Sequence, residues 1–312
     1  MSLEFEKDLL ELYQKVETLK KSKDAREEDL RRFQREYRKK VKSILSKLDP
    51  WQKVLIARHP NRPHTLDYIN LIFTDFIELH GDRCFGDDPS IVAGFAYFYK
   101  MPVAVIGHQK GRSTKEKMER NFGMPHPEGY RKAVRVAKLA EKYSMPVITF
   151  VDTPGAYPGI EAEERGQSQA IAQSLYTFAW LKVPTIAVVI GEGGSGGALA
   201  LAVANRVLML EHAVYSVISP EGCAAILWKN QEKVKEAARA LRLTAEDLYQ
   251  LGVVDCVIRE PLGFAHIDYT RTARVVKYFI RRYLKELLKL TPEELLKDRR
   301  EKFERMAYFV EV

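Results

Sequence analysis

The sequence has few cysteines and no long apolar run. Three cysteines occur in 312 residues, at Cys84, Cys223 and Cys256, with no CxxC pair. This excludes a disulfide framework and gives no support to a structural zinc site, so we expect no metal in this chain. No stretch reaches the roughly 18 apolar residues of a membrane span, and the first residues do not resemble an export signal. We therefore expect a cytoplasmic protein without membrane contact.

A strong excess of one charge sign is also missing from the central part of the chain. The formal net charge is +8, but residues 1–50 carry 14 basic and 11 acidic side chains, and residues 266–312 carry 12 and 8. Both signs alternate in these flanks at helical spacing, which is typical of solvated helix faces and not of a basic surface that tracks phosphates. Nucleic-acid binding is therefore not expected. The 46% of hydrophobic residues is enough to bury a full core.

Apolar spacing divides the chain into three parts. Leu9, Leu12, Val16 and Leu19 repeat at intervals of three and four, and a second such series runs through residues 30–48, which predicts a helical hairpin. A proline-broken stretch then ends the helical pattern. The predicted parts are a hairpin and linker (1–62), a main domain (63–265) and C-terminal helices (266–312).

The main domain alternates short apolar runs, rich in β-branched residues, with helical stretches. This alternation predicts an α/β domain with largely buried sheets, but it does not distinguish a doubly wound sheet from other α/β arrangements. The expected strands are 90–99, 102–107, 146–152, 184–190, 206–210 and 213–218. The expected helices are 130–144, 162–181 and 197–205, followed by 269–290 and 292–306 in the C-terminal part.

A glycine-rich stretch, residues 191–200, joins an apolar strand to an apolar helix. Gly196 and Gly197 are expected at the start of this helix, where backbone amides lack intrahelical partners and the helix dipole favours negative charge. Two such amides could form an oxyanion hole, in which one donor typically lowers a barrier by roughly 3 kcal/mol.

Three other interpretations of the glycines compete with an oxyanion hole. The glycines could only permit tight packing of strand and helix. The interpretation as a phosphate-binding loop has less support, because the Walker motif requires Lys-Ser or Lys-Thr where Ala198-Leu199 stands. The third is a serine hydrolase, since residues 193–197 fit G-x-S-x-G around Ser195, and Asp255 and His266 follow in the expected order. The motif alone does not exclude the hydrolase.

Two further stretches follow expected strands. Residues 152–159 form a turn stiffened by two prolines, at the end of a strand where ligand pockets are common, although a plain connector has the same pattern. Residues 108–112 carry Lys110 and Arg112, which could hold an anionic substrate or could be solvated loop charges.

In combination, these stretches resemble one family, the alpha subunits of acetyl-CoA carboxylase carboxyltransferases. The resemblance extends from the first helices to the C-terminus. It implies a crotonase-like (ClpP/crotonase) α/β fold, a spiral of strand-strand-helix units with helical extensions at both ends. It also implies transfer of a carboxyl group from carboxybiotin on a separate carrier protein to acetyl-CoA, giving malonyl-CoA for fatty-acid biosynthesis. The runs that carry the resemblance are 108–112, 121–125, 128–132, 152–159, 163–167, 191–198 and 216–223.

The resemblance also implies partners and site residues. It implies a beta subunit with a zinc ribbon in an assembly of two alpha and two beta subunits, together with the biotin carboxyl carrier protein and biotin carboxylase. The amides of Gly196 and Gly197 would bind the ureido oxygen of biotin, and the released biotin would act as the base that enolises acetyl-CoA. Apart from what the resemblance implies, the expected substrate-binding residues are Gly155, Ala156, Lys110, Arg112 and Ala198.

Overall fold

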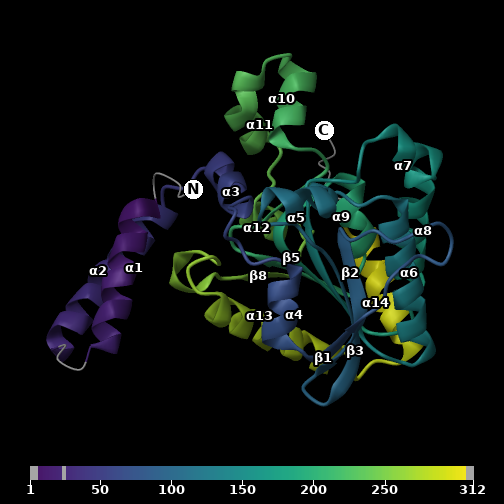
Figure 1. Cartoon of the computed structure of the whole chain (residues 1–312), viewed down its shortest axis with the longest axis horizontal. Coiled ribbons are helices and arrows are strands. Elements are labelled where there is room, and N and C mark those ends of the chain that lie inside the picture. Colours follow the sequence, from purple (N-terminus) through teal and green to yellow (C-terminus); the bar gives the residue numbers. More distant parts are fainter. Residues whose placement is uncertain (1–5, 23–25, 307–312) are drawn as a thin grey trace.

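The computed structural model describes residues 6–22 and 26–306, so the outermost residues of both predicted extensions lie outside the described ranges. Figure 1 shows a central sheet with helices on either side and a helical hairpin that projects from this body. Within the described ranges, no helix is both long enough and apolar enough to cross a membrane.

The two N-terminal helices expected from the apolar repeats are α1 (Lys7–Lys21) and α2 (Glu27–Leu45). They pack against each other, and their apolar sides meet Ile56 and Phe264 of the body in one cluster. Helix α3 (Pro50–Ala57) was not expected from the sequence; Asp49 caps it in a capping box with Gln52. Helix α4 (Thr65–Ile72) begins the main domain.

The strands form one mixed sheet in the order β1-β2-β3-β4-β5-β6-β8, with β7 paired to the end of β5. Strands β3, β4, β5, β6 and β8 run parallel, whereas β1 and β2 are antiparallel to their neighbours. The six expected strands are present, β6 with the expected bounds and the other five with shifted ends, and β1 and β8 are additional. The strand bounds are β1 Thr74–Glu78, β2 Ile91–Phe98, β3 Met101–His108, β4 Val147–Thr153, β5 Thr185–Gly194, β6 Arg206–Leu210, β7 Val214–Ser216 and β8 Cys256–Ile258.

This strand order excludes the doubly wound arrangement. A doubly wound sheet reverses its strand order at a switch point. Here the order from β3 to β8 proceeds in one direction along the sheet, and β7 leaves it to pair with the last residues of β5. The chain therefore winds onward in one sense, as a spiral does.

The helices cover both faces of the sheet. The expected helix over 162–181 is broken at Gly166, whose φ of 81° is left-handed. Residues Val276, Ile280 and Leu284 of α13 lie in the same core as the strands, so the C-terminal helices complete the main core. The bounds are α5 Thr114–Glu119, α6 Pro127–Lys142, α7 Ile160–Glu164, α8 Gln167–Trp180, α9 Ser195–Ala202, α10 Pro220–Trp228, α11 Val234–Ala240, α12 Ala245–Gln250, α13 Tyr269–Leu287 and α14 Pro292–Glu304.

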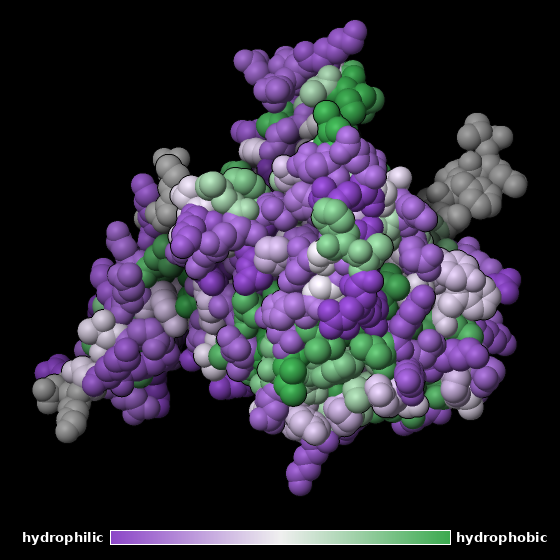
Figure 2. All heavy atoms as spheres, turned by 45° about the vertical axis from the view of Figure 1, so that its right-hand side comes forward, coloured by the Kyte–Doolittle hydropathy of each residue, from purple (hydrophilic) through white to green (hydrophobic). Residues whose placement is uncertain are grey.

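Helices α10 and α11 project beyond the sheet (Figure 1). In Figure 2 hydrophobic side chains are visible on the projecting part at the top of the molecule. The exposed apolar residues of α10 are Ile226, Leu227 and Trp228.

Candidate functional site

The stretches singled out in the sequence meet at one edge of the sheet. Strands β3, β4 and β5 are parallel neighbours, so the loops that follow their carboxyl ends lie at the same edge. Thr153 at the end of β4 pairs with Gly193 near the end of β5. The Lys110 Nζ atom, two residues after β3, lies 2.7 Å from Asp152 Oδ1 on β4.

The glycine run is a strand followed directly by a helix, without the intervening turn expected from the sequence. Strand β5 continues to Gly194, and α9 begins at Ser195. Gly196 and Gly197 are thus the second and third residues of α9, whose amides have no carbonyl partner within the helix. No side chain caps this helix start. Both glycines therefore lie at the N-terminus of a helix, as the sequence predicts.

Gly197 is packed against the turn that follows β4. A Cβ atom at Gly197 would lie 2.6 Å from Ala156 N, 2.7 Å from Gly155 C and 2.8 Å from the buried Tyr130 hydroxyl. At Gly196, a Cβ atom would meet only the side chain of Ile171, at an ordinary 3.5 Å. The structure thus requires glycine for close packing at Gly197, whereas Gly196 is half-buried and faces a less crowded space.

The turn after β4 places backbone beside these two glycines. The Thr153 hydroxyl donates to Gly155 O at 2.7 Å and accepts from Gly155 N at 3.1 Å, which fixes the turn. A Cβ atom at Gly155 would meet nothing within 4 Å, so Gly155 borders open space. Ala156 is half-buried next to Gly197, and the Ala198 side chain is fully buried in the core.

The two predicted cations have different partners. Lys110 is paired with the buried Asp152. Although burial raises the pKa of Asp152, the Lys110 ammonium holds it below its usual value. Arg112 instead donates to Asp67 of α4 at 2.6 Å and lies over the ring of Tyr269. The contacts described for Lys110 and Arg112 therefore do not bring them together around one anion.

The serine hydrolase interpretation is wrong. Ser195 is exposed, but the two residues expected to complete a triad have other partners. Asp255 accepts from Val207 N at 2.6 Å and pairs with Lys302 of α14. His266 contacts Glu6 Oε2 through Nε2 at 2.9 Å. A triad requires a hydrogen bond from the histidine to the acid, which these contacts do not provide.

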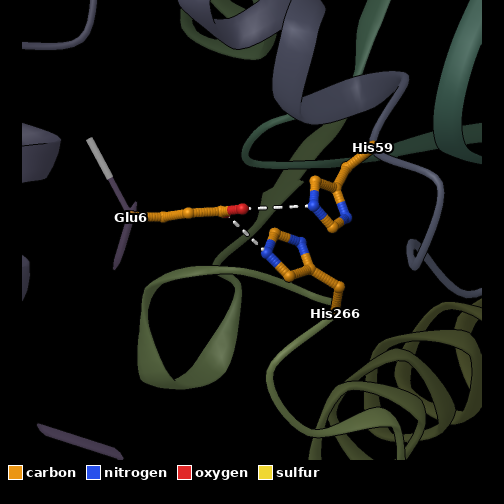
Figure 3. A group of neighbouring side chains, drawn as sticks. All are labelled: Glu6, His59 and His266. Atoms are coloured by element: carbon orange, nitrogen blue, oxygen red, sulfur yellow. Dashed lines mark hydrogen bonds and ion pairs between the residues drawn. The ribbon is translucent and has the colours of Figure 1, made fainter. Parts of the chain in front are cut away.

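His266 belongs to a buried cluster with Glu6 and His59 (Figure 3). The Glu6 carboxylate faces the edges of both histidine rings, with its oxygens 3.1 Å from His59 Nε2 and 2.9 Å from His266 Nε2. Two histidines and a carboxylate are a frequent donor set for zinc. Here, however, both Nε2 atoms face the Glu6 carboxylate directly, and the two rings are stacked with centroids 4.0 Å apart.

The protons of this cluster also favour hydrogen bonding over metal binding. His59 Nδ1 accepts from Asn61 N at 3.2 Å, which places the proton of a neutral His59 on the Nε2 atom that faces Glu6. Burial lowers the pKa of His266, so the ring of His266 is neutral near pH 7. Glu6 therefore fastens the start of the hairpin to the body.

Two arginines that the sequence patterns did not single out, Arg58 and Arg62, contact β5 just ahead of the glycine run. Arg58 donates to Glu192 at 2.6 Å and to Glu221 at 2.5 Å. Arg62 forms a buried ion pair with Glu260, in which Arg62 Nη2 lies 2.5 Å from Glu260 Oε1. These partners are 134 to 198 residues apart in the chain. Charges at such separations show no local pattern, so the sequence offered no signal for the pairs.

Comparison with known proteins identifies relatives over nearly the whole chain. Residues 2–307 match the sequence model of the family described as acetyl co-enzyme A carboxylase carboxyltransferase-like. The chain is 60% identical to the acetyl-coenzyme A carboxylase carboxyl transferase subunit alpha of Aquifex aeolicus (strain VF5), over 99% of this chain and 97% of that protein. It is 54% identical to the protein of the same description from Anoxybacillus flavithermus, over 99% and 96%.

Solved structures of lower identity share the fold. A transcarboxylase 12S structure aligns with a TM-score of 0.57 at 24% identity, over 72% of this chain and 42% of that chain. A chain of a Pseudomonas malonate decarboxylase hetero-tetramer in complex with coenzyme A aligns with a TM-score of 0.58 at 18% identity, over 71% and 88%. The crotonase-like α/β fold implied by the resemblance is thereby confirmed.

Proposed function

The chain belongs to the family of acetyl-CoA carboxylase carboxyltransferase alpha subunits, and on this premise we propose that it forms the biotin side of a carboxyltransferase site completed by a beta subunit. It is a carboxyl-transferring enzyme subunit, which moves the carboxyl group of carboxybiotin to acetyl-CoA to give malonyl-CoA in fatty-acid biosynthesis. The observation that carries the proposal is the uncapped start of α9, with Gly196 and Gly197 beside the turn at Gly155.

This helix start suits a ligand that develops negative charge on an oxygen. Biotin supplies a ureido group that carries the carboxyl and becomes negative at oxygen as carbon dioxide leaves. The amides of Gly196 and Gly197 would donate to that oxygen, and the dipole of α9 favours the charge. The space beside Gly155 and Gly196, where a side chain would add bulk, supports the fit of the planar ureido group of biotin. Ala156 and Ala198 would contribute only backbone.

The described residues hold no convincing general base at the helix start. Lys110 is paired with Asp152, and His108 is fully buried, with its pKa lowered to about 4 by burial. A base supplied by the substrate pair itself, the released biotin, fits this arrangement. Lys110 would then act by fixing Asp152 and the end of β4.

A multi-subunit complex follows from membership of the family. We propose two alpha and two beta subunits, with biotin reaching the site on the carrier protein after carboxylation by biotin carboxylase. The beta subunit would supply most of the acetyl-CoA site and the zinc ribbon. The complex would work in the cytoplasm.

The proposal is tested by the reverse reaction. The purified chain is assayed for malonyl-CoA-dependent carboxylation of free biotin, alone and after mixing with a beta subunit of the same family. Activity that appears only in the mixture supports the shared site. Activity of the chain alone, or an inactive mixture that forms a stable complex, would contradict it.

Replacing Ser195 by alanine is expected to leave most of this activity, with kcat within about threefold of the unsubstituted protein. The proposed donors are backbone amides, and the exposed hydroxyl of Ser195 has no place in the mechanism. The variant is assayed in the mixture with the beta subunit. A folded Ser195→Ala protein without carboxyltransfer activity would show that the Ser195 hydroxyl takes part in the reaction.

A further inference from the structure

Arg58 bridges two carboxylates beside the glycine run. Its Nε and Nη2 atoms donate to Glu192 Oε1 at 3.0 and 2.6 Å, and its Nη1 atom donates to Glu221 Oε1 at 2.5 Å. Arg58 ends α3, Glu192 lies on β5 and Glu221 is in the first turn of α10. One guanidinium thus ties three elements together at the edge of the sheet that carries the site.

Glu192 is the last side chain before the glycines. Its backbone N–H donates to Asp152 Oδ1 at 3.0 Å, and Asp152 in turn binds Lys110. The Glu192 carboxylate is nearly buried, and Lys110 lies 3.8 Å from its second oxygen. Both the backbone and the side chain of this residue are therefore held, four residues ahead of Gly196.

The charges in this group nearly cancel. Two cations, Lys110 and Arg58, face three anions, Asp152, Glu192 and Glu221, which gives a net charge of −1. Without Arg58 the same group carries −2. This further negative charge opposes the negative charge that the start of α9 must stabilise. For a separation on the order of 10 Å and an effective dielectric constant of about 20, the repulsion slows the reaction roughly tenfold.

We propose that Arg58 is a positioning residue for carboxyltransfer, which holds Glu192 in place and neutralises it ahead of the amides of Gly196 and Gly197. This inference rests on the proposed function. Arg58 does not touch the substrate; it acts through Glu192. Its loss therefore affects the transition state, in which the oxygen is charged, more than the binding of malonyl-CoA.

The test compares four variants in the mixture with the beta subunit, using malonyl-CoA-dependent carboxylation of free biotin. Arg58→Met is expected to lower kcat about tenfold, with KM for malonyl-CoA within about twofold. Arg58→Lys keeps the charge and is expected to stay within about threefold in kcat. The double variant Arg58→Met/Glu192→Gln restores the net charge of −1, so kcat is expected to recover to within about threefold of the unsubstituted enzyme.

Arg206→Met is the matched control. Arg206 is also a partly buried arginine, paired with Asp298 at 2.8 Å, but it lies at the amino end of β6, at the opposite edge of the sheet. Its replacement is expected to lower the melting temperature about as much as Arg58→Met does, without changing kcat. A similar loss of kcat in both variants would indicate a merely structural role and would overturn the inference.

The remaining outcomes separate the inference from the proposed function. An inactive unsubstituted mixture would overturn both. An active mixture in which Arg58→Met retains full kcat, or in which the double variant is no better than the single one, would overturn the role of Arg58 alone. If Arg58→Met does not fold, a tenfold loss in the folded Arg58→Lys protein would overturn it as well.

Discussion

Replacing Gly197 by valine is expected to abolish carboxyltransfer, with a loss of at least a thousandfold in the mixture with the beta subunit. A Cβ atom at this position would lie 2.6 Å from Ala156 N and 2.7 Å from Gly155 C, so backbone must move. The shift would displace the helix start from the turn after β4 and misplace the Gly196 and Gly197 amides. Removal of one oxyanion-hole donor alone typically costs about a hundred- to a thousandfold in kcat.

The matched control is Gly196→Ala, because its Cβ atom would make only an ordinary contact with Ile171. Its melting temperature is expected to stay within about 2 °C of that of the unsubstituted protein, whereas Gly197→Val lowers it. Circular dichroism and complex formation with the beta subunit establish whether the valine variant is folded. A folded Gly197→Val protein with more than a tenth of the original kcat would contradict the assigned packing.

Replacing Glu260 by glutamine is expected to lower the free energy of unfolding of the isolated chain by about 3 to 5 kcal/mol. Arg62 and Glu260 form a fully buried pair, and the change leaves the Arg62 charge without its partner. Glu260 also accepts from His212 N at 3.0 Å, which links the loop after β6 to the pair. Urea titration at pH 7 measures the loss, and a value under 1 kcal/mol would contradict the role of the pair.

The same pair makes stability depend on pH. Although burial raises the pKa of Glu260, the Arg62 charge lowers it to about 2, below the unfolded value of about 4.3. The unfolded chain therefore binds the proton first, and about 3 kcal/mol of stability, present above pH 5, is lost as the pH falls towards 2. The surface variant Glu286→Gln serves as control, with an expected change under about 0.5 kcal/mol, because Glu286 and its partner Arg282 form an exposed pair.

Local sequence patterns predicted most elements of the fold because their causes are local. The apolar repeats of α1 and α2 and the β-branched runs of the central strands each lie within one element. Strand β8 was missed because Cys256–Ile258 is too short to show a period. The difference between a spiral and a doubly wound sheet was not local either, since it depends on which strands pair, and only the family resemblance indicated it before the structure.

In the candidate site, too, features with a local cause could be predicted from the sequence, whereas contacts between distant residues could not. The position of Gly196 and Gly197 at a helix start followed from a strand pattern, glycines and a helix pattern in immediate succession. The order Ser195, Asp255, His266 also satisfied a hydrolase motif, but order along the chain does not fix partners in space. In the structure Asp255 pairs with Lys302, and His266 contacts Glu6. Arg58 could be found only in the structure, because its contacts cross more than 130 residues.

A structure of the chain in complex with the beta subunit and bound biotin tests the role of the α9 start most directly. The ureido oxygen is expected within about 3 Å of the backbone nitrogens of Gly196 and Gly197, at the start of α9. A ureido oxygen bound by side chains elsewhere, with both glycine amides facing away from the ligand, would show that this helix start does not stabilise the departing biotin.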